Sequence, residues 1–232
     1  MKAGFPYALT RLHARVGRRP GADARKRLRA VGDFGHFLQQ AAQVGYAPWL
    51  RKLGPGSDVH SVELALRETW RGAIAEVAEW VPARWREAVE WLTLAPDLPV
   101  LAELIEHGRR ADWMGRDPQW ARLPTESGDA VLAALRPRWP TLDEHEPHEL
   151  GEAWCAQAEA LQPRLGTDDR RVMHELLQAQ LGAADPAVLL KRFRRESGAP
   201  VRVFAWAGLA RFDFAFLRGQ LVRRRLEVRE AA

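Results

Sequence analysis

The chain has 232 residues but only one cysteine, four lysines and two tyrosines. The single cysteine, Cys155, cannot form an internal disulfide, which agrees with a reducing compartment. No apolar run approaches the roughly 20 residues that span a bilayer. The opening segment, MKAGFPYALTRLHARVGRR, lacks the apolar core of a secretory signal and carries its arginines after its apolar residues. We therefore expect a cytoplasmic protein.

Strand-like patterns are nearly missing as well, because apolar and polar residues rarely alternate and β-branched residues do not cluster. A period of 3.6 residues dominates, as is typical of amphipathic helices. The sequence therefore predicts an all-α, multi-helical protein of two or more packed helical lobes. The predicted helices lie near 5–17, 22–31, 33–44, 60–81, 98–107, 147–161, 167–181, 186–196 and 203–228, with one more opened by Pro82 and a short one opened by Thr125 with Asp129.

The best candidate for a boundary between lobes is the segment 106–125, EHGRRADWMGRDPQWARLPT. It combines turn-forming glycines and a proline with mixed charge and a broken helical period. We expect an N-terminal lobe at 1–110 and a C-terminal lobe at 111–232.

A tight corner, Pro96-Asp97-Leu98-Pro99, interrupts two predicted helices in REAVEWLTLAPDLPVLAELI. A solvent-exposed linker would be polar, whereas this corner carries leucines, including Leu98 and Leu101. We expect a packed helix–helix corner in which Asp97 caps the second helix.

Motifs for catalysis are absent: the sequence has no glycine-rich phosphate loop, no GxSxG and no HExxH. His145 and His148 lie among acids in LDEHEPHE, but no third ligand follows at a metal-site spacing, so a solvated loop is the better interpretation. The ten tryptophans could stack bases, but Trp70 and Trp85 are in phase with the apolar stripes, which favours core packing. The sequence thus predicts a protein that is not an enzyme, without a metal or cofactor.

Basic residues gather at both ends of the chain, although the net charge is only +5. Segment 11–29 holds eight cations and one acid, residues 191–195 read KRFRR and residues 223–225 read RRR. This placement indicates an acidic partner, which could be a protein surface, nucleic acid or lipid headgroups.

Several stretches resemble the C/d subunit family of rotary V-type and A-type ATPases. Tyr7 followed by RLHARVGRR (11–19) is similar to the family's tyrosine and ARVR-like basic helix. FGHFLQQAAQVGYAPWL is similar to its aromatic-leucine helix, which ends in a Thr-x-Tyr-like turn; Tyr46 matches, and Val44 stands in the threonine's place.

Three later stretches extend the resemblance. Val62-Glu63 stands where the family has an Ile-Glu pair. The corner is similar to an Asp-Leu-x-Asn-Leu motif, with Asp97, Leu98 and Leu101 matching and Val100 in place of the asparagine. LARFDFAFLRGQLVRRRL (209–226) resembles the closing helix and its Arg-Gly-Lys-like end, through Arg218-Gly219 and Arg223–Arg225.

The resemblance implies a non-catalytic subunit, present once per complex and monomeric in isolation, that links the central axle to the membrane rotor ring. It would be peripheral to the membrane, on the cytoplasmic face, through contacts with axle and ring subunits. The chain is shorter than typical three-lobed members, which implies a shortened, divergent subunit. The residues expected to bind partners are Tyr7, Arg11, Arg15, Tyr46, Arg218, Arg223 and Arg224, and those of the structural corner are Asp97, Leu98 and Leu101.

The alternative is a basic all-α protein that binds nucleic acid through its arginine-rich ends. Such a module usually gathers its arginines on one recognition element with a recognisable motif, and none is present here. Nucleic acid is therefore the less favoured partner.

Overall fold

The computed structural model describes residues 4–182, 184–195 and 198–230, and all regular structure within these ranges is helical. The prediction of an all-α, multi-helical fold is confirmed. The elements are α1 (Phe5–Gly17), α2 (Ala22–Arg29), α3 (Phe34–Ala41), the π-helical turn η1 (Ala42–Tyr46), α4 (Ala47–Leu50), α5 (Val59–Trp80), α6 (Ala83–Trp91), η2 (Leu92–Leu94), α7 (Leu98–His107), η3 (Asp112–Gly115), α8 (Gly128–Leu135), η4 (Arg136–Arg138), η5 (Pro140–Glu144), η6 (Pro147–Glu149), α9 (Leu150–Ala160), α10 (Thr167–Leu181), α11 (Pro186–Arg195) and α12 (Ala199–Glu230).

Several helix ends follow local capping chemistry. The Asp33 carboxylate accepts a hydrogen bond from the His36 amide at 2.6 Å, and Asp58 accepts one from the Ser61 amide at 2.7 Å. Gly108 ends α7 with a positive φ of 64°. The predicted start at Thr125 was wrong, because Ser127 caps α8 instead. The end of the helix predicted at 186–196 falls on residue 196, which lies outside the described residues.

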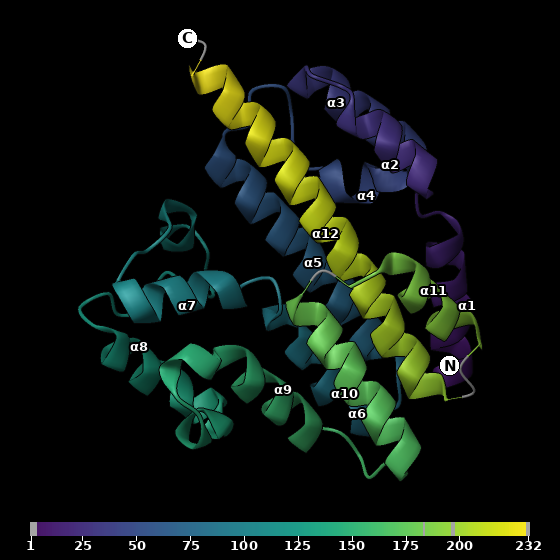
Figure 1. Cartoon of the computed structure of the whole chain (residues 1–232), viewed down its shortest axis with the longest axis vertical. Helices are drawn as coiled ribbons and strands as arrows, with labels where there is room; N and C mark the ends of the chain where they lie inside the picture. Colours follow the sequence, from purple (N-terminus) through teal and green to yellow (C-terminus); the bar gives the residue numbers. More distant parts are fainter. Residues whose placement is uncertain (1–3, 183, 196–197, 231–232) are drawn as a thin grey trace.

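The C-terminal helix α12 is the axis of the molecule. Its 32 residues span about 48 Å at 1.5 Å per residue, so it crosses the whole structure (Figure 1). Helix α5 lies beside it and runs in the opposite direction, with α1, α10 and α11 also in contact with α12. Contact on several sides explains why apolar residues surround α12 between Val201 and Leu217 instead of forming one stripe.

Helix α12 also completes the N-terminal part of the fold. It contacts α1, α3 and α5, all of which lie within the predicted lobe 1–110. Buried apolar residues from both predicted lobes belong to one continuous cluster. Residues of the segment 106–125 also pack into this cluster. The lobe boundary expected at that segment stays a prediction.

The corner between α6 and α7 is packed, as expected. Leu94, Leu98 and Leu101 are all buried there. The tryptophans in phase with the apolar stripes, Trp70 and Trp85, are buried as well, which confirms core packing at those positions. Across the described part of the chain, no helix combines the length and apolar character needed to cross a membrane.

Candidate functional site

An open cleft of about 910 Å³ lies between α1, η1, α4, α5 and α12. Two residues predicted to bind partners, Arg15 and Tyr46, line it. Its lining residues are Arg15, Arg18, Arg19, Pro20, Gln43, Val44, Gly45, Tyr46, Ala47, Pro48, Trp49, Arg51, Thr69, Ala73, Glu76, Trp206, Ala210 and Asp213. Four arginines face two carboxylates across apolar walls, so this cleft favours an acidic and apolar ligand surface.

Gly45 shapes one wall of the cleft. Its φ of 117° is a conformation that side-chain-bearing residues rarely adopt. A Cβ at this position would lie 2.3 Å from the carbonyl oxygen of Arg18, so η1 approaches the end of α1 closely. This close approach places Tyr46 against α12.

Asp213 of α12 binds residues from both neighbouring walls. The Tyr46 hydroxyl donates to Asp213 Oδ1 at 3.1 Å. Arg19 donates from Nε to Oδ2 at 2.5 Å and from Nη2 to Oδ1 at 2.9 Å. Burial raises the pKa of Tyr46 well above its ordinary value, and the charge of Asp213 adds to this effect. Tyr46 is therefore a neutral hydrogen-bond donor that helps to hold the base of the cleft together, not a free surface residue.

The basic residues of α1 are paired with groups of this chain. The guanidinium groups of Arg11 and Arg15 lie 4.9 and 4.6 Å from the Trp80 ring centroid. Both arginines also pair with Glu76, Arg11 at 3.6 Å. Tyr7 contacts Trp80 edge-on at 6.2 Å. The structure thus brings three predicted partner residues together around Trp80, with Arg11 about half exposed.

Two arginines of the cleft were not among the residues predicted to bind partners. Arg18 and Arg51 are exposed and line the cleft, and neither makes an ion pair with any carboxylate in the described part of the chain. Arg18 lies in the basic run 11–29, but nothing in the sequence separates it from its paired neighbours. Arg51 follows Trp49 and Leu50 at the end of α4, so only the fold shows that it lines the same cleft as Arg15 of α1.

The residues of the corner take part in a second, buried cluster. Arg67 donates from Nε to Asp97 Oδ1 at 2.6 Å and also pairs with Glu63. Trp120 donates from Nε1 to Asp97 Oδ2 at 2.9 Å. Arg71 lies 3.5 Å from the same oxygen and pairs with Asp117. Burial raises the pKa of Asp97, while the two arginines and Trp120 act in the opposite direction.

Asp97 lies at the N-cap position of α7, as predicted, but the prediction that its side chain caps the helix was wrong. No backbone amide of α7 donates to its side chain. Its two carboxylate oxygens instead accept from Arg67 and Trp120, and the charged guanidinium of Arg67 is a stronger partner than a terminal amide. Asp97 thus stabilises the corner through tertiary contacts, and Leu98 and Leu101 of the same corner are buried.

The three predicted partner residues near the C-terminus lie in different environments. Arg218 is half exposed and pairs with Glu63. Arg223 is half exposed and lies 3.6 Å from Glu227. Arg224 is only 1% exposed and donates to the backbone carbonyls of Leu28 and Val31 at the end of α2. The placement of Arg224 on a partner surface was wrong, because its side chain fastens α2 to α12.

The histidines considered as metal ligands do not meet further ligands. His145 Nδ1 lies 3.0 Å from the carbonyl oxygen of Thr141, while His148 is exposed. Within the described ranges, no three His, Cys, Asp or Glu side chains gather in a way that could hold a metal ion.

Comparison with known proteins adds no relative: no protein-family model, curated protein or solved structure matches the chain.

Proposed function

We propose that this protein is a non-catalytic coupling subunit of a rotary V/A-type ATPase, in which the cleft between α1, α4 and α12 receives an acidic, apolar element of a partner subunit. The observation that carries the proposal is the cleft itself. It is open, it has apolar walls, and its two unpaired arginines, Arg18 and Arg51, lie at its surface.

The contacts between the resembling stretches support this proposal. Glu63, from the stretch similar to the family's Ile-Glu pair, binds Arg67, which binds Asp97 of the corner. Glu63 also binds Arg218 of the closing helix. These three stretches are far apart in the sequence, yet their charged residues meet in one cluster. Such contacts are expected if the stretches form the core of one family fold.

The cleft has features of an interaction surface. Trp49 is partly exposed there, whereas Tyr46 and Trp206 line the cleft but are nearly buried, and interfaces are enriched in aromatic residues and arginine. The pairs Arg15–Glu76 and Arg19–Asp213 are already neutralised within the chain. A partner with acidic side chains would therefore meet mainly Arg18 and Arg51, while its apolar side chains contact Trp49.

The alternative function, nucleic-acid binding, has weaker support. Phosphate binding needs arginines that are free to contact the backbone. Many arginines of the basic ends instead contact groups of the same chain: Arg11, Arg15, Arg19, Arg25, Arg29, Arg218, Arg224 and Arg225. We therefore keep this alternative as an outcome of the test.

The test is a pull-down at physiological salt from the source organism, followed by identification of the captured proteins. We compare the natural chain with the double variant Arg18→Glu, Arg51→Glu. The matched control is Arg122→Glu, which reverses an exposed arginine outside the cleft. We expect ATPase axle or ring subunits with the natural chain and the control, and at least a tenfold loss with the double variant.

A duplex-DNA titration at low and at physiological salt completes the test. We expect weak binding that disappears at the higher salt. Specific DNA binding that survives physiological salt, with no ATPase subunit recovered, would refute the proposal and favour the alternative. Equal recovery with the double variant would refute the role of the cleft.

A further inference from the structure

Arg211 of α12 forms no ion pair with any carboxylate in the part of the chain that the structure describes. Its guanidinium and that of Arg67 lie 5.2 and 5.6 Å from the centroid of the Phe214 ring, so it borders the buried cluster of the corner. That cluster pairs Arg67, Arg71 and Arg218 with three carboxylates, whereas Arg211 makes no ion pair within the described ranges. The Nε atom of Arg211 is buried without a hydrogen-bond partner.

Burial of this guanidinium is unfavourable. It lowers the pKa of Arg211 to about 10. The charges of Arg67 and Arg218 act in the same direction, and the charge of Asp97 acts in the opposite direction. The side chain nevertheless remains cationic at neutral pH. The side chain is partly exposed, but its Nε atom is shielded from water without a partner, so an anion that reached Arg211 would supply a contact that the fold lacks.

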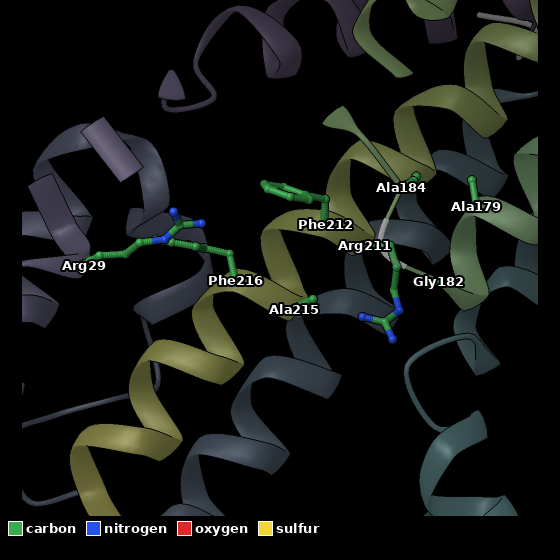
Figure 2. Close-up of a pocket in the computed structure, with 9 residues that line it drawn as sticks. Arg29, Ala179, Gly182, Ala184, Arg211, Phe212, Ala215 and Phe216 are labelled. Atoms are coloured by element: carbon green, nitrogen blue, oxygen red, sulfur yellow. The ribbon is translucent and has the colours of Figure 1, made fainter. Parts of the chain in front are cut away.

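A small cavity of about 170 Å³ opens beside Arg211, between α12, α10 and α2 (Figure 2). Gly208, Arg211, Phe212 and Ala215 follow one another at helical spacing and present one face of α12 to it. In Figure 2, Arg29 and Arg211 lie on opposite sides of Phe212. The full lining is Arg29, Ala179, Gly182, Ala184, Gly208, Arg211, Phe212, Ala215 and Phe216.

A second unpaired polar group lies next to this cavity. Gln180 of α10 is fully buried, and neither its amide nitrogen nor its amide oxygen has a hydrogen-bond partner. A Cβ added at Gly208, which lines the cavity, would lie 3.6 Å from Gln180 Nε2. Buried amides in folded proteins are nearly always satisfied, so this one calls for a missing partner.

We propose that this cavity binds a small carboxylate with an apolar body, whose charged oxygens are held by Arg211 with help from the Gln180 amide. The carboxylate would supply the negative charge that Arg211 lacks and an acceptor for the unpaired donors. The apolar body would lie against Phe212, Phe216 and the alanines of the wall.

Size and composition favour this class of ligand over inorganic phosphate. A cavity of about 150 Å³ with apolar walls holds a benzene ring. Apart from the two arginines, the lining side chains are alanines, glycines and phenylalanines, which offer nothing to the further oxygens of a phosphate. The proposal is independent of the rotary-ATPase function, because the cavity shares no lining residue with the cleft.

Benzoate is the probe, with its neutral counterpart benzamide and inorganic phosphate as comparisons at equal ionic strength. We measure Tm against probe concentration and affinity by titration calorimetry. The variant Arg211→Met removes the charge, and Ala215→Leu fills the cavity from an exposed helix position. Arg122→Met removes an exposed arginine elsewhere and is the control.

We expect benzoate to raise Tm saturably in the natural chain and in Arg122→Met, because a ligand that binds only the folded state stabilises it. Affinity should fall at least tenfold in Arg211→Met and in Ala215→Leu, and benzamide and phosphate should bind at least tenfold more weakly than benzoate. Without ligand, Arg211→Met should melt at a higher temperature than the natural chain, since it removes the unpaired charge.

Three results would overturn the proposal. They are the absence of a saturable benzoate effect in the natural chain, an unchanged effect in Arg211→Met, and equal binding of benzamide or phosphate. The Tm of Arg211→Met without ligand is measured alongside, and we expect it to be higher than that of the natural chain. A loss of the benzoate effect in this variant therefore cannot be attributed to unfolding.

Discussion

Arg218 and Glu63 lie 155 residues apart in the chain and form a two-point ion pair. Arg218 Nε donates to Glu63 Oε2 at 3.0 Å, and its Nη2 lies 2.7 Å from Oε1. The pair joins the middle of α12 to the first turns of α5, and through Arg67 it extends to Asp97 at the corner. The long axis of the molecule and its tightest corner are thus stabilised by one connected set of charges.

This network predicts that Asp97→Ala is far more damaging than the loss of a helix cap. Removing a cap costs about 1 kcal/mol, whereas removing one partner of a buried ion pair costs about 3–5 kcal/mol. Arg67 and Trp120 would both lose their acceptor. We expect the larger loss in urea denaturation, and a change of 1 kcal/mol or less would contradict the tertiary role of Asp97.

The neighbours Arg223 and Arg224 offer a matched pair. Arg224→Met leaves the carbonyl oxygens of Leu28 and Val31 without their donor and should lower the free energy of unfolding by about 2–3 kcal/mol. Arg223→Met removes only an exposed pair and should stay within about 0.5 kcal/mol. Equal effects, measured by chemical denaturation, would refute the structural role of Arg224.

Two glycines should respond to alanine with opposite signs. Gly45→Ala forces a side chain into a positive φ and against the carbonyl oxygen of Arg18, so we expect a loss of at least about 2 kcal/mol. Gly72 lies exposed within α5, where a Cβ meets nothing within 4 Å, and Gly72→Ala should gain about 0.5–1 kcal/mol. A neutral Gly45→Ala would mean that the turn facing the cleft is not held as described.

Cys155 should be unreactive in the folded protein. It is buried in α9, and burial raises the pKa of its thiol to about 12. Since the thiolate is the reactive form, a thiol reagent at pH 8 should label it only after unfolding in guanidinium chloride. Rapid labelling of the native chain would contradict this and show that α9 opens readily. The measurement is the labelling rate with and without denaturant.

The candidate site was only partly predictable from sequence. Tyr7, Arg11 and Arg15 came from motif similarity, and the structure does gather them around Trp80. Arg18 and Arg51, which have no carboxylate partner among the described residues, could not be distinguished from the many other arginines. A basic residue becomes available to a partner only when no acid of its own fold reaches it, and that depends on contacts across the whole chain.

The amino-acid sequence by itself determined where the helices form and how several of them begin. The 3.6-residue period sets the helical faces, and Asp33 and Asp58 cap amides only three residues away, so local rules suffice there. Only the tertiary structure decided what Asp97 and Arg224 do. Asp97 meets Arg67 across 30 residues and Arg224 meets Leu28 across 196. A buried charge takes the strongest partner that the fold brings near it, and no pattern within one helix shows which partner that is.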